Sequence, residues 1–252
     1  MPRLGDEETV DKLQALKVYT QYRDLISTAP LEIIYSGSAD LERVKQALAA
    51  AFATLPREEV RVISTAAPHV CRESVQHVED VLDVTQGKLG MGFSCGSDDM
   101  PALLMGNTLF GGSSNSKLFL NVREKLSLCY YASSLYHRQK GLITVSSGIE
   151  FQNYQRAYDE IMAQLEAVQE GELEDWELEG ARSTLLNSYA TVGDSQGKLE
   201  NFYLGQAATG QHETPADLAR AIQDMTAERI CRAMSTVKLD TVYFLKGKEV
   251  EA

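Results

Sequence analysis

Two apolar runs near the middle of the chain constrain the fold most. CYYASSLYHR (129–138) and GLITVSSGI (141–149) are rich in Tyr, Val, Thr and Ile and are separated by a short polar turn, which is the pattern of a β-hairpin. Further strand-like segments are predicted at 75–84, at 89–93 and in the closing TVYFLKG. Because a hairpin pairs its strands antiparallel, the sequence predicts a mostly antiparallel sheet.

Most of the remaining sequence has helical patterns. Apolar residues recur at helical spacing from Tyr154 to Val168, and Gly171 ends this helix. Thr214 and Thr226 have the character of N-caps. The other predicted helices cover 10–27, 38–56, 100–110, 116–125, 173–192 and 195–208. Strands and helices in separate runs indicate an α+β fold, a layered domain in which helices cover the sheet.

The first part of the chain has the pattern of the end of a second, related domain. LEIIYSG (31–37) is similar to TVYFLKG, because each is a short apolar run that contains Tyr and ends on Gly. We therefore expect residues 1–58 to be the helix-strand-helix tail of a preceding domain, 59–68 a linker, and 69–252 the carboxyl-terminal domain. The apolar face of the helix at 38–56 is expected to point inward: Leu41, Val44, Leu48, Ala51 and Phe52.

Composition excludes several classes of protein. A net charge of -12 and a pI near 4.8 argue against nucleic-acid binding, which needs several Lys or Arg contacts. No apolar run is long enough to span a membrane and the amino terminus lacks a signal-peptide pattern, so we expect no membrane partner and a cytoplasmic location. The four cysteines lie far apart and are expected to be reduced and mostly buried.

Charge is distributed unevenly along the chain. Residues 150–180 hold ten acids and one base, the pattern of a solvated face on two helices or, in a sharper interpretation, of a surface that steers basic peptides. The segment from Lys117 to Lys140, in contrast, holds five Lys or Arg residues and one acid, Glu124. This local excess of positive charge raises the question of what it faces.

The stretch that begins this basic segment resembles a known family. NTLFGGSSNSKLFLNVREKLSLCYYASS (107–134) is similar to the second-domain signature of the pitrilysin and insulin-degrading-enzyme family of zinc metallopeptidases, inverzincins that include mitochondrial processing peptidase. The segments 31–56 and 86–96 resemble the end of that family's first domain and the opening strand of its second. The resemblance implies the mitochondrial processing peptidase-like metallohydrolase fold.

The resemblance also implies roles for individual residues. Arg123 and Tyr130 match the arginine and tyrosine that hold substrate carbonyls and support the oxyanion, and Gly111, Gly112, Ser113 and Ser114 match a substrate-binding loop. From the residues alone, Arg123 on a helix and Tyr130 at the start of a strand could project towards one site. The alternative is an ordinary helix-face charge and a packed strand residue.

The family's zinc site is missing from this sequence. Family catalysis uses H-x-x-E-H, but the histidines here are His69, His77, His137 and His212, and no two are four residues apart. His69 near Cys71 and His77 near Glu79 are interpreted as incidental. We therefore expect no metal or other cofactor in this chain, with zinc in a catalytic half or partner.

Two explanations of the missing zinc site remain open. The chain is either the carboxyl-terminal portion of a longer peptidase or a zinc-free member, closest to the bacterial YfmF-like type. The leading function is the substrate-binding, non-zinc half of a peptidase, whose partners are a peptide substrate and a zinc-bearing homologous half or subunit. The alternatives are a non-catalytic scaffold and an unrelated α+β binder of small ligands.

Overall fold

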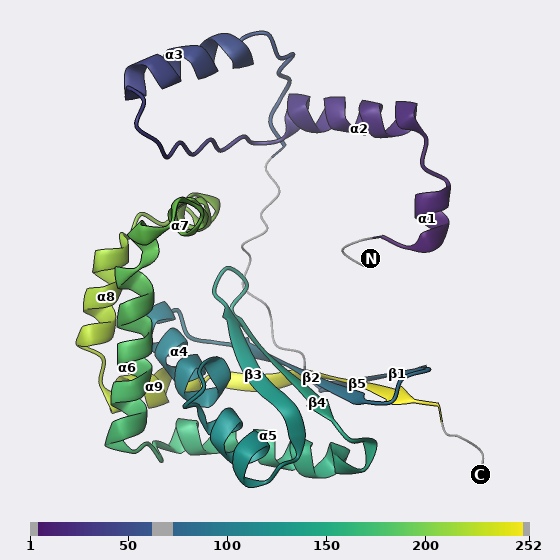
Figure 1. Ribbon diagram of the computed structural model, residues 1–252, viewed down its shortest axis with the longest axis vertical. Helices are drawn as coiled ribbons and strands as arrows, with labels where there is room; N and C mark the ends of the chain where they lie inside the picture. Colours follow the sequence, from purple (N-terminus) through teal and green to yellow (C-terminus); the bar gives the residue numbers. More distant parts are fainter. Residues whose placement is uncertain (1–4, 62–72, 249–252) are drawn as a thin grey trace. The chain divides into compact units, whose positions relative to one another are not determined.

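The computed structural model describes residues 5–61 and 73–248 (Figure 1). The chain divides into two compact units, Met1–Ser64 and Thr65–Ala252. Each unit is described by itself.

The second unit is built on a five-stranded sheet with the strand order β1-β5-β2-β4-β3. Its strands are β1 (Gln76–Leu82), β2 (Gly87–Cys95), β3 (Cys129–His137), β4 (Leu142–Ile149) and β5 (Val237–Gly247). Only the pairing of β1 with β5 is parallel among these strands. The predicted α+β fold with a mostly antiparallel sheet is therefore confirmed, as is the predicted hairpin.

Helices cover one face of this sheet, and Figure 1 shows α5 running along it. The helices of the unit are α4 (Met100–Asn107), α5 (Tyr154–Glu170), α6 (Asp175–Ala190), α7 (Gln196–Thr209), α8 (Pro215–Gln223) and α9 (Ala227–Met234). The alternating side chains Leu89, Met91 and Phe93 of β2 are buried in a single core together with Ile161 and Leu165 of α5. Burying each large apolar side chain contributes about 1.5 to 3 kcal/mol.

Sequence signals set the ends of these helices. Gly171 ends α5 in the left-handed conformation (φ 83°). The hydroxyl groups of Thr214 and Thr226 accept hydrogen bonds from the first turns of α8 and α9, so both are N-caps as predicted. Short 3-10 turns precede α5 (η3, Phe151–Asn153) and α7 (η4, Val192–Asp194).

The predicted helices at 100–110 and 116–125 differ from regular α-helices. After α4 the chain continues as two wide π-helical segments, η1 (Thr108–Gly112) and η2 (Leu118–Lys125). Gly111 lies against β3 here, since a Cβ atom at this position would come within 2.7 Å of the backbone nitrogen of Ser134. A glycine lets the wide turn approach the strand this closely.

The first unit contains α1 (Glu7–Asp11), α2 (Ala15–Thr28) and α3 (Leu41–Phe52). The single helix predicted at 10–27 is thus two helices in the structure. The prediction of a strand at 31–37 is wrong, because this segment has no regular structure. A strand needs a neighbour to pair its backbone groups, and the described part of this unit contains no strand that could provide one.

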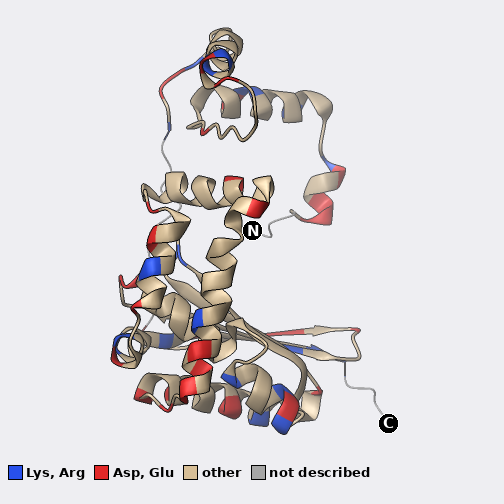
Figure 2. Ribbon diagram, turned by 60° about the vertical axis from the view of Figure 1, so that its left-hand side comes forward, with Lys and Arg blue, Asp and Glu red and all other residues tan. Residues whose placement is uncertain are grey.

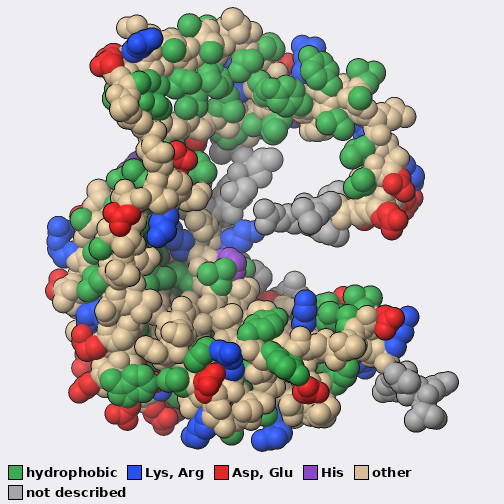
Figure 3. All heavy atoms as spheres, viewed as in Figure 1, with side chains coloured by type: hydrophobic (Ala, Val, Ile, Leu, Met, Phe, Trp, Pro, Cys, Tyr) green, Lys and Arg blue, Asp and Glu red, His purple; other side chains and the backbone are tan. Residues whose placement is uncertain are grey.

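The apolar face of α3 is exposed, so its predicted inward orientation is also wrong for this structure. Asp40 caps α3 by accepting a hydrogen bond from the Arg43 backbone N–H at 2.9 Å, but none of the residues of α3 is buried. Leu41 is 54% exposed. Figure 3 shows hydrophobic side chains gathered on the surface of this unit. The periodicity identified the helix correctly, but the described residues cover its apolar face only in part, at the half-buried Val44 and Leu48.

Candidate functional site

A tight turn between η2 and β3 positions the two residues singled out from the sequence. Arg123 lies in the last turn of η2 and Tyr130 near the start of β3. The Leu128 N–H donates to the Val122 carbonyl at 3.0 Å and thereby closes the turn. Ser127 has a φ of 50° and is the one non-glycine residue of the described chain in the left-handed region. The backbone geometry of this turn brings the end of the helix and the start of the strand together.

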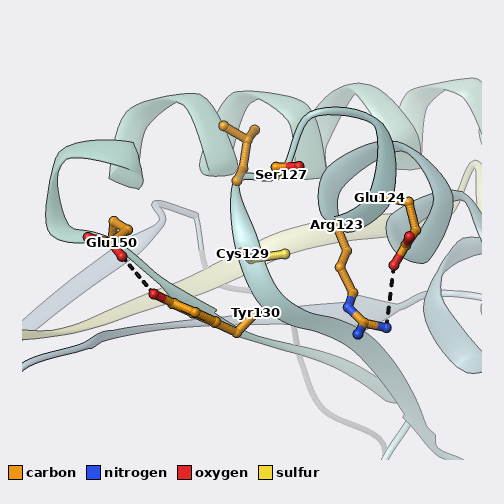
Figure 4. A pocket seen from close by; sticks show the side chains of 7 residues that line it. Arg123, Glu124, Ser127, Cys129, Tyr130 and Glu150 are labelled. Atoms are coloured by element: carbon orange, nitrogen blue, oxygen red, sulfur yellow. Dashed lines mark hydrogen bonds and ion pairs between the residues drawn. The ribbon is translucent and has the colours of Figure 1, made fainter.

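Arg123 and Tyr130 line a common surface cavity of about 440 Å³ (Figure 4). The other lining residues are Glu124, Ser127, Leu128, Cys129 and Glu150. The structure therefore places the predicted pair at one site, as the spacing suggested. Sequence reasoning missed Glu150 and Cys129. The hairpin offered a signal for both, because Ile149 pairs with Cys129 across β3 and β4 and brings the next residue, Glu150, to the same end.

Within the cavity, each polar group of the pair contacts an acidic neighbour. The Tyr130 hydroxyl donates a hydrogen bond to Glu150 Oε1 at 2.7 Å. Arg123 Nη1 lies 3.6 Å from Glu124 Oε1, and the guanidinium carbon lies 4.7 Å from the centre of the Phe119 ring. Figure 4 shows the two side chains extending in different directions, Tyr130 towards Glu150 and Arg123 beside Glu124. A ligand that engaged both would compete with these internal contacts.

The hydrogen bond between Tyr130 and Glu150 has an electrostatic consequence. It raises the pKa of the Tyr130 phenol, because the neighbouring carboxylate accepts a hydrogen bond from the neutral phenol and its negative charge opposes ionisation. Tyr130 is 60% exposed, so this neutral hydroxyl lies at the surface. A neutral phenol is a hydrogen-bond donor that suits a carbonyl or an oxyanion.

The basic segment from 117 to 140 does not face one site, which answers the question that its charge raised. Lys117 is buried, and its Nζ lies 3.0 Å from Oε1 and 3.1 Å from Oε2 of Glu177 in α6. Arg138 donates to Gln211 Oε1 at 2.8 Å and lines a different cavity. Of the five basic residues, Arg123 alone lines the cavity that contains Tyr130. Packing between distant elements therefore explains part of the local charge.

The acidic stretch from 150 to 180 is mostly exposed on helices, but two of its residues have partners on distant segments of the chain. Glu177 is buried against Lys117, and Glu150 contacts Tyr130. Figure 2 shows acidic residues interleaved with basic ones on the helices of this unit. For most of the stretch, this arrangement agrees with the solvated-face interpretation.

The loop residues Gly111, Gly112, Ser113 and Ser114 do not line the cavity around Tyr130. A Cβ atom at Gly112 would lie 2.9 Å from Asn107 Nδ2, and Ser113 Oγ donates to the Thr108 carbonyl at 3.4 Å. Gly111 is buried. The structure thus gives this loop packing contacts, and its contact with substrate stays a prediction.

The residues of this chain do not fit the family's zinc site. The sequence has no H-x-x-E-H, and the described residues contain no group of three or more His, Cys, Asp or Glu side chains placed to hold a metal ion. His137 Nε2 lies 3.0 Å from Thr144 Oγ1 on the neighbouring strand. His69 and Cys71, which the sequence placed near each other, lie outside the described residues. No catalytic step can be assigned to a metal held by this chain's own motif.

Residues 12–185 match the profile described as the peptidase M16 inactive domain. The chain belongs to the peptidase M16 family. A Bacillus subtilis relative, "Probable inactive metalloprotease YmfF", is 36% identical over 252 residues, covering 97% of this chain and 58% of that protein. The bacterial type that the sequence resembles therefore corresponds to YmfF, which corrects the name YfmF. A second M16 relative from the same organism, "Uncharacterized zinc protease YmxG", is 23% identical over 154 residues, which are 59% of this chain and 38% of that protein.

Solved structures show the same M16 architecture. A conserved protein from Enterococcus faecalis has a TM-score of 0.85 and 25% identity, and the match covers 100% of this chain and 60% of that one. The peptidase M16 inactive domain from Pseudomonas fluorescens has a TM-score of 0.75 and 16% identity, covering 98% of this chain and 60% of that one. The chain therefore spans about three fifths of the length of these two proteins.

These findings define the M16 domain at a coarse level. It is an inactive-type peptidase domain with a mixed α+β fold. None of the helices in the described part of the chain is long and apolar enough to cross a membrane.

Proposed function

We propose that this chain is the substrate-binding, non-zinc half of a pitrilysin-type metallopeptidase acting on peptides. It would complete the active site of an H-x-x-E-H-bearing half or partner. The observation that carries the proposal is the shared cavity of Arg123 and Tyr130, which combines a cationic fork with a neutral phenol. These are the donors that would stabilise negative charge developing on a peptide carbonyl oxygen.

We further propose that residues 1–58 are the tail of a preceding M16-type domain, 59–68 a linker, and 69–252 the carboxyl-terminal domain. The exposed apolar residues of α2 and α3 support this, since Leu16 is 75% exposed and Leu25 is 58% exposed. A helix with an apolar face gains stability by packing that face against another element. The length of the M16 relatives, which exceeds that of this chain, is compatible with such a domain.

The second candidate is a non-catalytic scaffold or partner subunit in a peptidase-like complex. Two observations favour it: the Tyr130 hydroxyl is already bonded to Glu150, and the relative YmfF is described as a probable inactive metalloprotease. In that case Arg123 and Tyr130 serve peptide binding alone.

The two candidates differ in the effect of Tyr130→Phe on turnover. The test combines the chain with an H-x-x-E-H-bearing M16 half or partner and measures steady-state cleavage of a peptide. If Tyr130 supports the transition state, Tyr130→Phe should lower kcat by about 100-fold, with KM changed less, and Arg123→Lys should also lower turnover. Lys125→Gln, on the same turn of η2 but outside the cavity, is the matched control.

Unchanged turnover in a well-folded Tyr130→Phe protein would remove the catalytic role and leave the scaffold. Melting temperatures of all variants serve as the folding control. Tightly bound stoichiometric zinc together with peptide cleavage by this chain alone would contradict both candidates.

A further inference from the structure

A second cavity of about 510 Å³ lies in the same unit and shares no lining residue with the cavity around Tyr130. Three segments that are distant in sequence form its walls: the end of β2 and the loop after it, the β3–β4 turn, and the end of α7 with the residues that follow. The lining residues are Cys95, Gly96, Ser97, Asp98, Met100, Tyr136, Arg138, Gln139, Gly141, Thr209 and Gln211. The proposed peptidase role uses none of them.

The Arg138 guanidinium is held in place on the cavity wall. Arg138 Nη2 donates to Gln211 Oε1 at 2.8 Å, and Thr209 Oγ1 donates to the same oxygen at 3.2 Å. The Gln211 N–H donates to the Gln206 carbonyl at 2.9 Å, across the left-handed Gly210 that ends α7. Because a guanidinium has five N–H donors, one bond to Gln211 orients it and leaves donors for a ligand.

The other lining groups provide one negative charge and several neutral donors. Asp98 is an exposed carboxylate. Its neighbour Asp99 is paired with Arg229 at 2.7 and 2.9 Å, so the charge of Asp99 is already balanced. Burial raises the pKa of the Cys95 thiol and of the Tyr136 phenol to about 12 each, and both remain uncharged near pH 7. The cavity therefore presents one cation, Arg138, and one anion, Asp98, among neutral lining groups.

The end of α7, which orients Arg138 through Gln211, also contains a buried side-chain amide without a hydrogen-bond partner. Gln206, whose backbone carbonyl anchors Gln211, is 3% exposed, and neither its Nε2 nor its Oε1 has a partner among the described residues. Nearby in sequence, Glu213 Oε2 is in the same condition. Buried polar groups are rarely left unpaired, but neither residue lines the cavity, so the proposal below does not use them.

We propose that this cavity binds the carboxylate and the ammonium group of an amino acid or short peptide, with Arg138 at the carboxylate and Asp98 at the ammonium. Arginine forms bidentate, charge-assisted bonds with carboxylates, and a carboxylate accepts from an ammonium group. The volume lies within the range of ligand sites for small molecules. The inference does not rest on the proposed function, because a scaffold could carry the same site.

The first test uses the wild-type chain and follows binding by calorimetric titration. The probes are tri-alanine, its carboxyl-terminal amide, its N-acetylated form, and alanine. Tri-alanine should bind, and removing either terminal charge should weaken binding by about tenfold or more. Comparable binding of alanine would identify free amino acids as the source, whereas selective binding of tri-alanine would identify short peptides. No binding of either, or equal binding of the capped forms, overturns the proposal.

The second test locates the site with variants. Arg138→Gln and Asp98→Asn should each weaken binding of the uncapped probe by about tenfold. Lys140→Gln, an exposed cation on the same turn that does not line the cavity, should leave binding unchanged. If binding survives Arg138→Gln, the site is elsewhere and the proposal fails.

Discussion

Lys117 and Glu177 form a buried ion pair that links the start of η2 to the first turn of α6. Their side chains are 10% and 7% exposed, and Glu177 Oε2 also accepts from the Glu174 N–H at 2.9 Å. Burying two charges is costly, and the pair is stable only because each charge compensates the other. Lys117, within the stretch that resembles the family signature, is therefore part of the internal packing of the domain.

Removing one member of this pair should destabilise the protein strongly. Lys117→Met leaves Glu177 buried without its counter-ion, and we expect the free energy of unfolding of the second unit to fall by about 3 to 5 kcal/mol. Urea unfolding followed by circular dichroism measures this. Lys125→Met, an exposed charge on the same segment, should change stability by no more than about 0.5 kcal/mol. Equal effects of the two substitutions would show that the pair contributes nothing specific.

Glu150 sets the ionisation of Tyr130. Since the Glu150 carboxylate accepts a hydrogen bond from the phenol and its charge opposes ionisation, Glu150→Gln should lower the pKa of Tyr130 towards its ordinary value near 10. A pH titration of tyrosine ring carbons by NMR measures this pKa, and Tyr130→Phe identifies the signal. An unchanged midpoint in Glu150→Gln would mean that the hydrogen bond does not persist in solution.

At the scale of elements, the close contact of η1 with β3 depends on Gly111. A Cβ atom at Gly111 would lie 2.7 Å from Leu118 Cδ1, from Ser134 N and from Ser134 Oγ. Gly111→Ala should therefore cost about 1 to 3 kcal/mol in stability through overpacking. Gly193→Ala is the control, because no atom lies within 4 Å of that position. Thermal unfolding of the two variants compares them, and equal melting temperatures would contradict the tight contact.

The acidic residues around the start of α6 differ in exposure, because Glu177 in its first turn is buried whereas its acidic neighbours are exposed. Glu172, Glu174 and Asp175 are exposed, so replacing each with its amide should change stability by no more than about 0.5 kcal/mol per residue. Glu177→Gln, in the first turn of α6, should cost several times more because it leaves Lys117 without its counter-ion. Urea unfolding of the triple variant and of Glu177→Gln makes the comparison. Unfolding of the triple variant would favour a docking or steering role for this surface.

The elements of the second unit were predictable because each has a local signal. Two apolar runs rich in Tyr, Val, Thr and Ile around a short polar turn identified the hairpin, and caps such as Thr214 and Gly171 fixed helix ends. Arg123 and Tyr130, which their positions on a helix end and a strand start suggested could share a site, line one cavity, and their catalytic role stays a prediction. Glu150 and Glu177 lie 20 and 60 residues from their partners Tyr130 and Lys117, so only the folded structure reveals these contacts. The π-helical turns likewise depend on tertiary packing around Gly111.

For the whole molecule, the two units differ in how their apolar residues are used. The second unit has one continuous buried core, whereas the only buried residues of the helices in the described first unit are Ser27 and Thr28. The segment 31–37 was mistaken for a strand because its apolar residues fit a sheet that this chain does not provide there. Sequence pattern records the environment for which a segment is suited, and that environment can lie outside the described residues.

This difference predicts unequal protection of backbone amides from hydrogen exchange. Amides of β2, β4 and α5 lie in or beside the core and should exchange with the free energy of global unfolding. Amides of α2 and α3 should exchange by local opening that costs much less, because no buried apolar side chain holds these helices in place. Hydrogen exchange of the intact chain, followed by mass spectrometry of its peptides, measures the protection of each group. The protection of α7, whose only buried residue is Gln206, should lie between that of α5 and that of α2 and α3. Protection of α2 and α3 equal to that of α5 would mean that their apolar faces are covered in solution, by another copy of the chain or by a packing against the second unit.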